Sequence, residues 1–252
     1  MPIVRIAGNW KMNTDLPAAL QLASAVKERL EATESVESIV FPPFVSLGAV
    51  AALLRGSDVA VGAQNIHHED SGAFTGETSA QMLVDLCSYV ILGHSERRQT
   101  FGETSDIVSL KVRAALRAGL KPIVCVGEDL GDRDGGGAEA VVEAQVRDSL
   151  AGTVGSADIS VAYEPVWAIG SGRAATPELA QAMMSHIRSV LASVYGPDVA
   201  ADVSLLYGGS VNAGNIADFM EQPDINGGLV GGASLNADTF VDIVHRAAVT
   251  AS

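Results

Sequence analysis

Short, continuous apolar runs rich in Val and Ile recur along this chain, and they limit the folds open to it more than any other feature. They fall at Ile3–Ala7, Ser38–Phe41, Val59–Ala63, Tyr89–Leu92, Pro122–Val126, Ile159–Tyr163, Val203–Tyr207 and Gly227–Val230. Continuous rather than alternating apolar runs are typical of parallel strands whose outer side is covered by helices. The sequence therefore predicts an α/β protein built on a parallel sheet.

Longer, Ala-rich segments with helical spacing separate most of these runs. Leu16–Leu30 has apolar residues at steps of three and four, with Asp15 placed to cap it. Pro177–Tyr195 follows Thr176, a second candidate cap. A strand followed by a helix about eight times is the pattern of a closed (β/α)8 barrel, although an open doubly wound sheet uses the same elements. No linker breaks the pattern, so we expect residues 1–252 to form one domain.

Composition excludes several classes of protein. The chain carries a formal net charge of −14, which argues against nucleic acid as a partner. No run reaches the ~18 apolar residues of a membrane span, and Arg5 and Lys11 interrupt the first apolar stretch where a secretory signal would be continuous. We therefore expect a cytoplasmic protein without a membrane partner. Cys87 and Cys125 lie far apart in apolar runs, which favours two buried free thiols.

Polar residues suited to catalysis follow several of the predicted strands. Asn9 and Lys11 follow the first, His94 the fourth and Glu164 the sixth, while glycine pairs follow the last two. In a parallel barrel these ends meet at one face. Each residue alone has a structural explanation, such as a solvated lysine, a glutamate that caps a turn or a glycine in a tight turn. Unrelated structural uses would not gather at the same ends of different strands, so the combination favours an enzyme.

The chemistry open to this set is specific. A carboxylate fixed by the following Pro165 can remove a proton from a carbon next to a carbonyl. Lysine and histidine side chains can stabilise the enediolate oxygen that forms. Backbone N–H groups of glycine-rich turns can hold a phosphate. The segment Tyr163–Arg173, rich in small and apolar residues, has the composition of a lid that excludes water.

Six ordered motifs carry a family resemblance. They are Gly8-Asn-Trp-Lys-Met-Asn13, Gly72-Ala-Phe-Thr-Gly-Glu77, Ile91-Leu-Gly-His-Ser-Glu-Arg-Arg98, Ala162-Tyr-Glu-Pro-Val-Trp-Ala-Ile-Gly170, Tyr207-Gly-Gly-Ser-Val211 and Val230-Gly-Gly-Ala-Ser-Leu235. With these motifs the sequence resembles the triosephosphate isomerase family over nearly its whole length. The resemblance implies a single TIM barrel that interconverts dihydroxyacetone phosphate and D-glyceraldehyde 3-phosphate, in glycolysis and gluconeogenesis, without a cofactor or metal.

The resemblance also implies roles for individual residues. Glu164 is the base, His94 a neutral electrophile, and Lys11 with Asn9 completes the catalytic set. Substrate binding falls on Asn9, Lys11, Gly170, Ser171, Ser210, Gly231 and Gly232. The lid comprises Pro165, Val166, Trp167, Ala168, Ile169, Gly170, Ser171 and Gly172, and Ile169 and Leu229 close over the base.

Supporting roles follow by the same analogy. Glu96 is expected near Lys11 or His94, and Tyr207 and Ser210 near the lid at Ala175 and Gly172. Thr75 lies on a loop that reaches into a partner subunit, which implies a homodimer.

One departure from the family pattern lies in the lid, where Ser171-Gly172-Arg173 replaces the common Thr-Gly-Lys. His67 and His68 are adjacent but lack further ligands, so no metal site is predicted. Two alternatives stay open. One is another phosphosugar isomerase, or an aldolase that uses a Schiff-base lysine. The other is a catalytically silent relative that only binds, although such a protein would have no chemical reason to retain all four catalytic groups.

Overall fold

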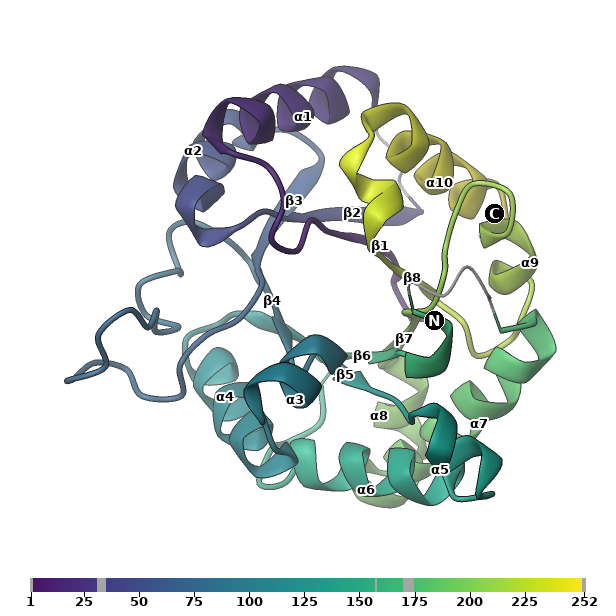
Figure 1. Cartoon of the computed structure of the whole chain (residues 1–252). Coiled ribbons are helices and arrows are strands. Elements are labelled where there is room, and N and C mark those ends of the chain that lie inside the picture. Colours follow the sequence, from purple (N-terminus) through teal and green to yellow (C-terminus); the bar gives the residue numbers. More distant parts are fainter. Residues whose placement is uncertain (1, 31–34, 157, 170–174, 251–252) are drawn as a thin grey trace.

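The computed structural model describes residues 2–30, 35–156, 158–169 and 175–250. Within these ranges eight parallel strands close into a barrel in chain order, and helices surround it (Figure 1). The strands are β1 (Val4–Asn9), β2 (Val36–Phe41), β3 (Val59–Ala63), β4 (Tyr89–Leu92), β5 (Lys121–Val126), β6 (Ser160–Tyr163), β7 (Ser204–Tyr207) and β8 (Gly227–Val230). The predicted (β/α)8 architecture is confirmed, and the open sheet is excluded because β1 pairs with both β2 and β8.

The helical elements lie outside the barrel (Figure 1). They are α1 (Leu16–Arg29), α2 (Phe44–Leu54), α3 (Ser95–Phe101), α4 (Ser105–Arg117), α5 (Leu130–Asp134), α6 (Ala138–Ser149), η1 (Val166–Ala168), α7 (Pro177–Tyr195), α8 (Pro197–Asp202), α9 (Ile216–Met220), η2 (Gly232–Leu235) and α10 (Ala237–Thr250). Among the residues described, no helix is long and apolar enough to span a membrane.

The predicted helix starts of α1 and α7 are confirmed. The Asp15 carboxylate accepts a hydrogen bond from Ala18 N at 2.9 Å, and the Thr176 hydroxyl accepts one from Leu179 N at 3.3 Å. Both side chains satisfy an N–H group that has no partner inside the helix. Cys87 and Cys125 are buried and free, as predicted.

Each strand buries both of its faces, which explains why the runs are continuously apolar. Successive residues alternate between a large cluster under the helices and a smaller cluster inside the barrel. Ile6, Val90 and Val124 belong to the first cluster, while their neighbours Ala7 and Ile91 belong to the second. The period of two is present in the structure but invisible in the sequence, because both environments select apolar side chains.

The strand–helix repeat is interrupted between β3 and β4. Residues 64–88, all of them described, form turns and one isolated bridge between His67 and Ser79 in place of a helix. His67 N donates to Thr78 O at 2.8 Å and closes the base of the loop, which projects from the barrel wall (Figure 1). Its middle, with Gly72 and Gly76 at positive φ, is unsuited to a helix.

The end of the barrel where the strands begin is closed by a polar layer. Arg5 is only 1% exposed, and its Nε donates to Glu37 Oε2 at 3.0 Å. Its Nη1 donates to the hydroxyls of Ser160 and Ser204 at 3.0 and 2.7 Å, so one guanidinium joins four strands. A buried charge needs such partners, because an unpaired one is expensive to remove from water.

We expect Arg5→Met to destabilise the fold. The change keeps an unbranched side chain but leaves the half-buried Glu37 and two buried hydroxyls without a donor. Loss of one partner of a buried ion pair costs roughly 3–5 kcal/mol, here near the lower end because Glu37 retains contact with solvent. Urea denaturation at fixed protein concentration measures the change. Arg29→Met, which removes the exposed pair with Asp238, should cost less than about 1 kcal/mol. Equal losses in both variants would contradict the assignment.

Candidate active site

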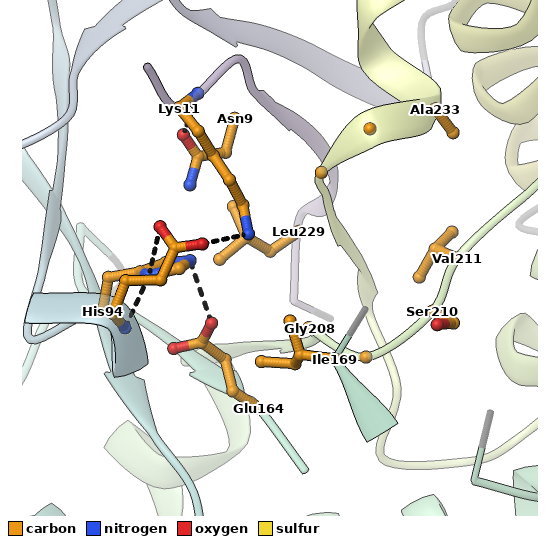
Figure 2. Close-up of a pocket in the computed structure, with 14 residues that line it drawn as sticks. Asn9, Lys11, His94, Glu164, Ile169, Gly208, Ser210, Val211, Leu229 and Ala233 are labelled. Carbon is orange, nitrogen blue, oxygen red and sulfur yellow. Dashed lines mark hydrogen bonds and ion pairs between the residues drawn. The ribbon is translucent and has the colours of Figure 1, made fainter. Parts of the chain in front are cut away.

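A cavity of about 450 Å³ opens where the strands end, and it is lined by all four predicted catalytic residues and by every predicted substrate-binding residue that the structure describes (Figure 2). The predicted lid residues Pro165, Val166, Trp167 and Ala168 and the predicted dimer-loop residue Thr75 do not line it. Asn9, Lys11, His94, Glu164, Ile169, Ser210, Leu229, Gly231 and Gly232 were expected there, and Glu96, Gly208, Gly209, Val211 and Ala233 complete the lining. Of the predicted binding and lid residues, Gly170, Ser171 and Gly172 lie outside the described residues. The ends of five different strands, β1, β4, β6, β7 and β8, thus contribute to a single cavity.

The Glu164 carboxylate is the most deeply placed polar group in the cavity wall. It is 2% exposed and accepts three hydrogen bonds, from His94 Nε2 at 3.0 Å, from Ser95 N at 2.9 Å and from the Ser95 hydroxyl at 3.1 Å. Burial alone raises the pKa of this carboxyl, but the donors of His94 and Ser95 stabilise the charged form and hold the pKa below its usual value. These contacts therefore stabilise the ionised form of Glu164.

His94 lies at the start of α3 and faces Glu164 (Figure 2). Its Nδ1 accepts a hydrogen bond from Glu96 N at 3.2 Å, while Glu96 Oε2 is 3.7 Å away and too distant for one. A ring nitrogen that accepts from an amide carries no proton, so the proton of the neutral ring is on Nε2. Burial lowers the pKa of the imidazole and the Glu164 carboxylate raises it, with a net upward shift while the two are in contact.

Lys11 occupies a backbone conformation that lysine rarely adopts, with φ of +53°. Two side chains fix it, because Lys11 N donates to Asn9 Oδ1 at 3.0 Å and Gln64 Nε2 donates to Lys11 O at 2.8 Å. The ammonium group reaches across the cavity and lies 2.7 Å from Glu96 Oε1 (Figure 2). The predicted contact between Glu96 and Lys11 is thus confirmed.

Comparison with known proteins identifies the family. The triosephosphate isomerase family model matches residues 4–247. Triosephosphate isomerase from Chloroflexus aurantiacus is 53% identical over 97% of this chain and 99% of its own. That from Herpetosiphon aurantiacus is 52% identical over 95% of this chain and 97% of its own, and that from Dehalococcoides mccartyi (strain ATCC BAA-2266 / KCTC 15142 / 195) is 49% identical over 96% of each. The chain belongs to the triosephosphate isomerase family.

Two residues of this family member that sequence reasoning did not single out shape the site around Glu164. Ser95 supplies two of its three hydrogen bonds, and its place directly after His94 in the motif was the available signal. Gly208 makes room for the Glu164 side chain, since a Cβ there would lie 2.9 Å from Glu164 Cγ and 3.1 Å from Tyr163 O. From the sequence, this glycine pair indicates only a turn whose N–H groups can bind phosphate. The contact with Glu164 joins two neighbouring strands and has no signal in the local sequence.

The described part of the predicted lid is held at several points. Trp167 Nε1 donates to Glu128 Oε1 at 2.9 Å, and the same oxygen accepts from Tyr163 and Arg133 at 3.0 Å each. The Ser210 hydroxyl donates to Ala168 O at 3.2 Å. On the far side of the undescribed segment 170–174, Ala175 N donates to the Tyr207 hydroxyl at 3.2 Å. The predicted contact between Tyr207 and Ala175 is confirmed, and the one at Gly172 falls in the segment 170–174.

In this family member we expect the His94 ring to be neutral at pH 8, with its proton on Nε2. A proton on Nδ1 would face the Glu96 N–H and break that hydrogen bond. Long-range ¹⁵N–¹H correlation spectra of the imidazole distinguish an unprotonated Nδ1 from a protonated one. The partly buried His245 on α10, far from the cavity in sequence, serves as the reference ring in the same spectrum. A His94 signal from two protonated nitrogens, or from a proton on Nδ1 alone, would contradict the assignment.

Proposed function

We propose that this chain interconverts dihydroxyacetone phosphate and D-glyceraldehyde 3-phosphate by proton transfer through an enediolate, with Glu164 as the base. Membership of the triosephosphate isomerase family makes the chain an intramolecular aldose–ketose isomerase of triose phosphates. The observation that carries the catalytic assignment is the 3.0 Å contact between Glu164 Oε1 and His94 Nε2 at the wall of the cavity.

In the proposed mechanism the reacting part of the substrate enters beside this pair, with Glu164 as the base and His94 as the hydrogen-bond donor. A substrate carbonyl oxygen takes the hydrogen bond of His94 Nε2, which releases Glu164 Oε1 toward the adjacent carbon. The carboxylate then removes a proton from one carbon and returns it to the other, while the hydroxyl proton passes from one substrate oxygen to the other beside His94 Nε2. The neutral imidazole donates to the oxygen on which charge develops, and a donor fixed in advance needs no reorganisation at that moment.

The phosphate site is assigned to Lys11 and to backbone N–H groups. Gly231 and Gly232 line the cavity at the start of η2, and a Cβ on Gly231 would lie 3.5 Å from Lys11 Cε. Ser210 lines the same side of the cavity. Lysine near several backbone N–H groups suits a dianion within an acidic protein, since the attraction is local. Gly170 and Ser171, which the family resemblance adds to this site, remain part of the proposal.

Residues Pro165–Gly172 are assigned to a lid over the substrate. Ile169 lines the cavity near Leu229, so closure would bring two apolar side chains over the base. Removal of water disfavours the charged carboxylate and so increases its basicity, and it protects the enediolate from loss of phosphate. The Ser171-Gly172-Arg173 sequence at the end of the lid is expected to set its opening rate without removing a catalytic group.

The rival functions fit the site less well. An aldolase would need a lysine free to attack the substrate carbonyl, but Lys11 Nζ is paired with the Glu96 carboxylate at 2.7 Å. A silent binding protein would not need a buried carboxylate hydrogen-bonded to a histidine. We assign the reaction to glycolysis and gluconeogenesis and the chain to the cytoplasm, for which the family's metabolic role is the support, and cell fractionation tests the location.

A homodimer built on the loop at residues 64–88 is the proposed assembly of this single domain. The loop carries the exposed Thr75 at its projecting part. A second cavity of about 250 Å³ beside the active site is lined by Asn9, Lys11, Met12, Phe44 and other residues. Met12, Phe44 and Phe101 are exposed apolar residues that all line this cavity, and apolar residues gathered at one exposed place mark interfaces. A partner's loop in this cavity would contact Asn9 and Lys11, which line it, and so hold both side chains in place.

We expect the mass in solution to be twice that of the 26.0 kDa chain. Sedimentation equilibrium at micromolar concentration measures it. Thr75→Arg, which adds a long charged side chain at the loop tip, should shift the equilibrium toward the monomer and lower activity with it. Asp58→Arg, on the loop before β3, should leave the mass unchanged. A wild-type monomer would exclude the proposed dimer.

Replacement of the base should abolish most of the turnover. Glu164→Gln keeps the size and an acceptor for Ser95 but cannot remove a proton, so we expect kcat to fall about 10³-fold in a folded protein. The assay couples isomerisation of D-glyceraldehyde 3-phosphate to reduction of dihydroxyacetone phosphate, and circular dichroism checks the fold. Glu143→Gln, on the outer face of α6, should keep wild-type turnover. Near-normal activity of Glu164→Gln would assign the base to another group.

Small phosphorylated anions should compete with the substrate. We expect phosphoglycolate and inorganic phosphate to act as competitive inhibitors, and Lys11→Met to weaken the binding of both at least tenfold. A charge-assisted hydrogen bond contributes about 1.5–3 kcal/mol, which corresponds to this factor. Lys27→Met, on α1, is the matched control and should bind them normally. Saturating phosphoglycolate that left the rate unchanged would move the phosphate site elsewhere.

A further inference from the structure

The segment that follows β5 supports the base from behind. Glu164 N donates to Val126 O at 2.7 Å, and the next residue, Gly127, lies against the Glu164 carbonyl. A Cβ on Gly127 would be only 1.7 Å from Glu164 O, so no other residue fits there without moving the backbone of the base. The position of Gly127 therefore fixes the position of the Glu164 backbone.

Regular strand pairing does not hold Gly127. The ladder between β5 and β6 ends at the pair Val126 and Tyr163. Beyond it, the side chain of Gln145 on α6 takes over. Gly127 N donates to Gln145 Oε1 at 2.8 Å, and Gln145 Nε2 donates to Gly127 O at 3.1 Å. One amide group thus pairs with both polar groups of the glycine, as a neighbouring strand would, and a two-point contact fixes orientation as well as distance.

The same segment also holds the first turn of the lid. Glu128 O accepts a hydrogen bond from Val166 N at 3.1 Å, and the buried Glu128 carboxylate accepts from Trp167. Movement of Gly127 would therefore displace the base and the start of the lid together. Gln145 itself does not line the active-site cavity, but lines a separate cavity of about 140 Å³ together with Gly127 and Glu164.

We propose that Gln145 is a positioning residue for the reaction, which fixes the Glu164 backbone through Gly127. The inference rests on the proposed function of Glu164 as the base. Proton abstraction depends steeply on the placement of the base, and a displacement of about 1 Å can cost a factor of 10². An amide that fixes the adjacent backbone at two points therefore has a catalytic effect without any contact with the substrate.

Gln145→Met tests the inference, because it keeps the length of the side chain and removes both hydrogen bonds. We expect kcat to fall about tenfold with KM within a factor of two, since the phosphate site is untouched. The deuterium isotope effect on kcat, with substrate deuterated at the transferred position, should rise because proton transfer becomes slower. The weakened contacts of Glu164 should raise its pKa, so the acid limb of kcat/KM, where activity is lost as the base is protonated, should move to higher pH.

Gln181→Met is the matched control. Gln181 on α7 holds Asp224 in the same two-point manner, with Nε2 donating to Asp224 Oδ2 at 2.7 Å and Oε1 accepting from Asp224 N at 3.1 Å. Both variants should lose a similar amount of thermal stability, but only Gln145→Met should change the isotope effect and the pH profile. If Gln145→Met does not fold, Gln145→Glu replaces it, since it keeps the acceptor for Gly127 N and should show the same changes to a smaller extent.

The outcomes distinguish the positioning role of Gln145 from the proposed role of Glu164 as the base. Active wild-type protein with a Gln145→Met variant that matches Gln181→Met in kcat, isotope effect and acid limb would overturn the positioning role alone. A folded wild-type protein without isomerase turnover would overturn the proposed function and the inference together.

Discussion

Closure of the parallel barrel is the constraint on which the rest of the structure depends. Pairing of β1 with β8, with Arg5 opposite Gly227 and Gly8 opposite Val230, leaves no free edge and turns all strand ends toward one face. Residues separated by more than 150 positions, such as Lys11 and Glu164, meet there only because the ring is closed. The chemistry of the site is a consequence of this topology together with the residues that follow each strand.

A second constraint is the charge balance inside the cavity. The described lining contains one cation, Lys11, and two carboxylates, Glu96 and Glu164. Each carboxylate has its own partner, since Glu96 pairs with Lys11 while Glu164 is held by His94 and Ser95. The arrangement stabilises the charged form of Glu164 without using the cation, and Lys11 has only the half-exposed Glu96 as its partner. Under the proposed function, this separation lets a chain with a net charge of −14 present a local cation to a phosphate.

The sequence predicted the barrel, its strand positions and the convergence of Asn9, Lys11, His94 and Glu164, because these depend on local patterns and on strand ends. It did not predict contacts that join backbone to backbone across strands. The approach of Gly127 and Gly208 to Glu164 leaves no compositional trace beyond a glycine. Nor did the turns of residues 64–88 follow from the strand–helix repeat, since their conformation depends on glycines and on a bridge between distant residues.

The polar layer around Arg5 lies at the opposite end of the barrel from the reaction, with an apolar layer that includes Ala7 and Ile91 between them. Energetic coupling between sites so separated is small, and their mutational effects should add. Folding stability and catalytic rate are therefore encoded in different parts of each strand. In evolution, such a chain can adapt to a hotter or saltier habitat through substitutions where the strands begin, while the residues that follow the strand ends stay unchanged. Protein engineers can use the same division of labour.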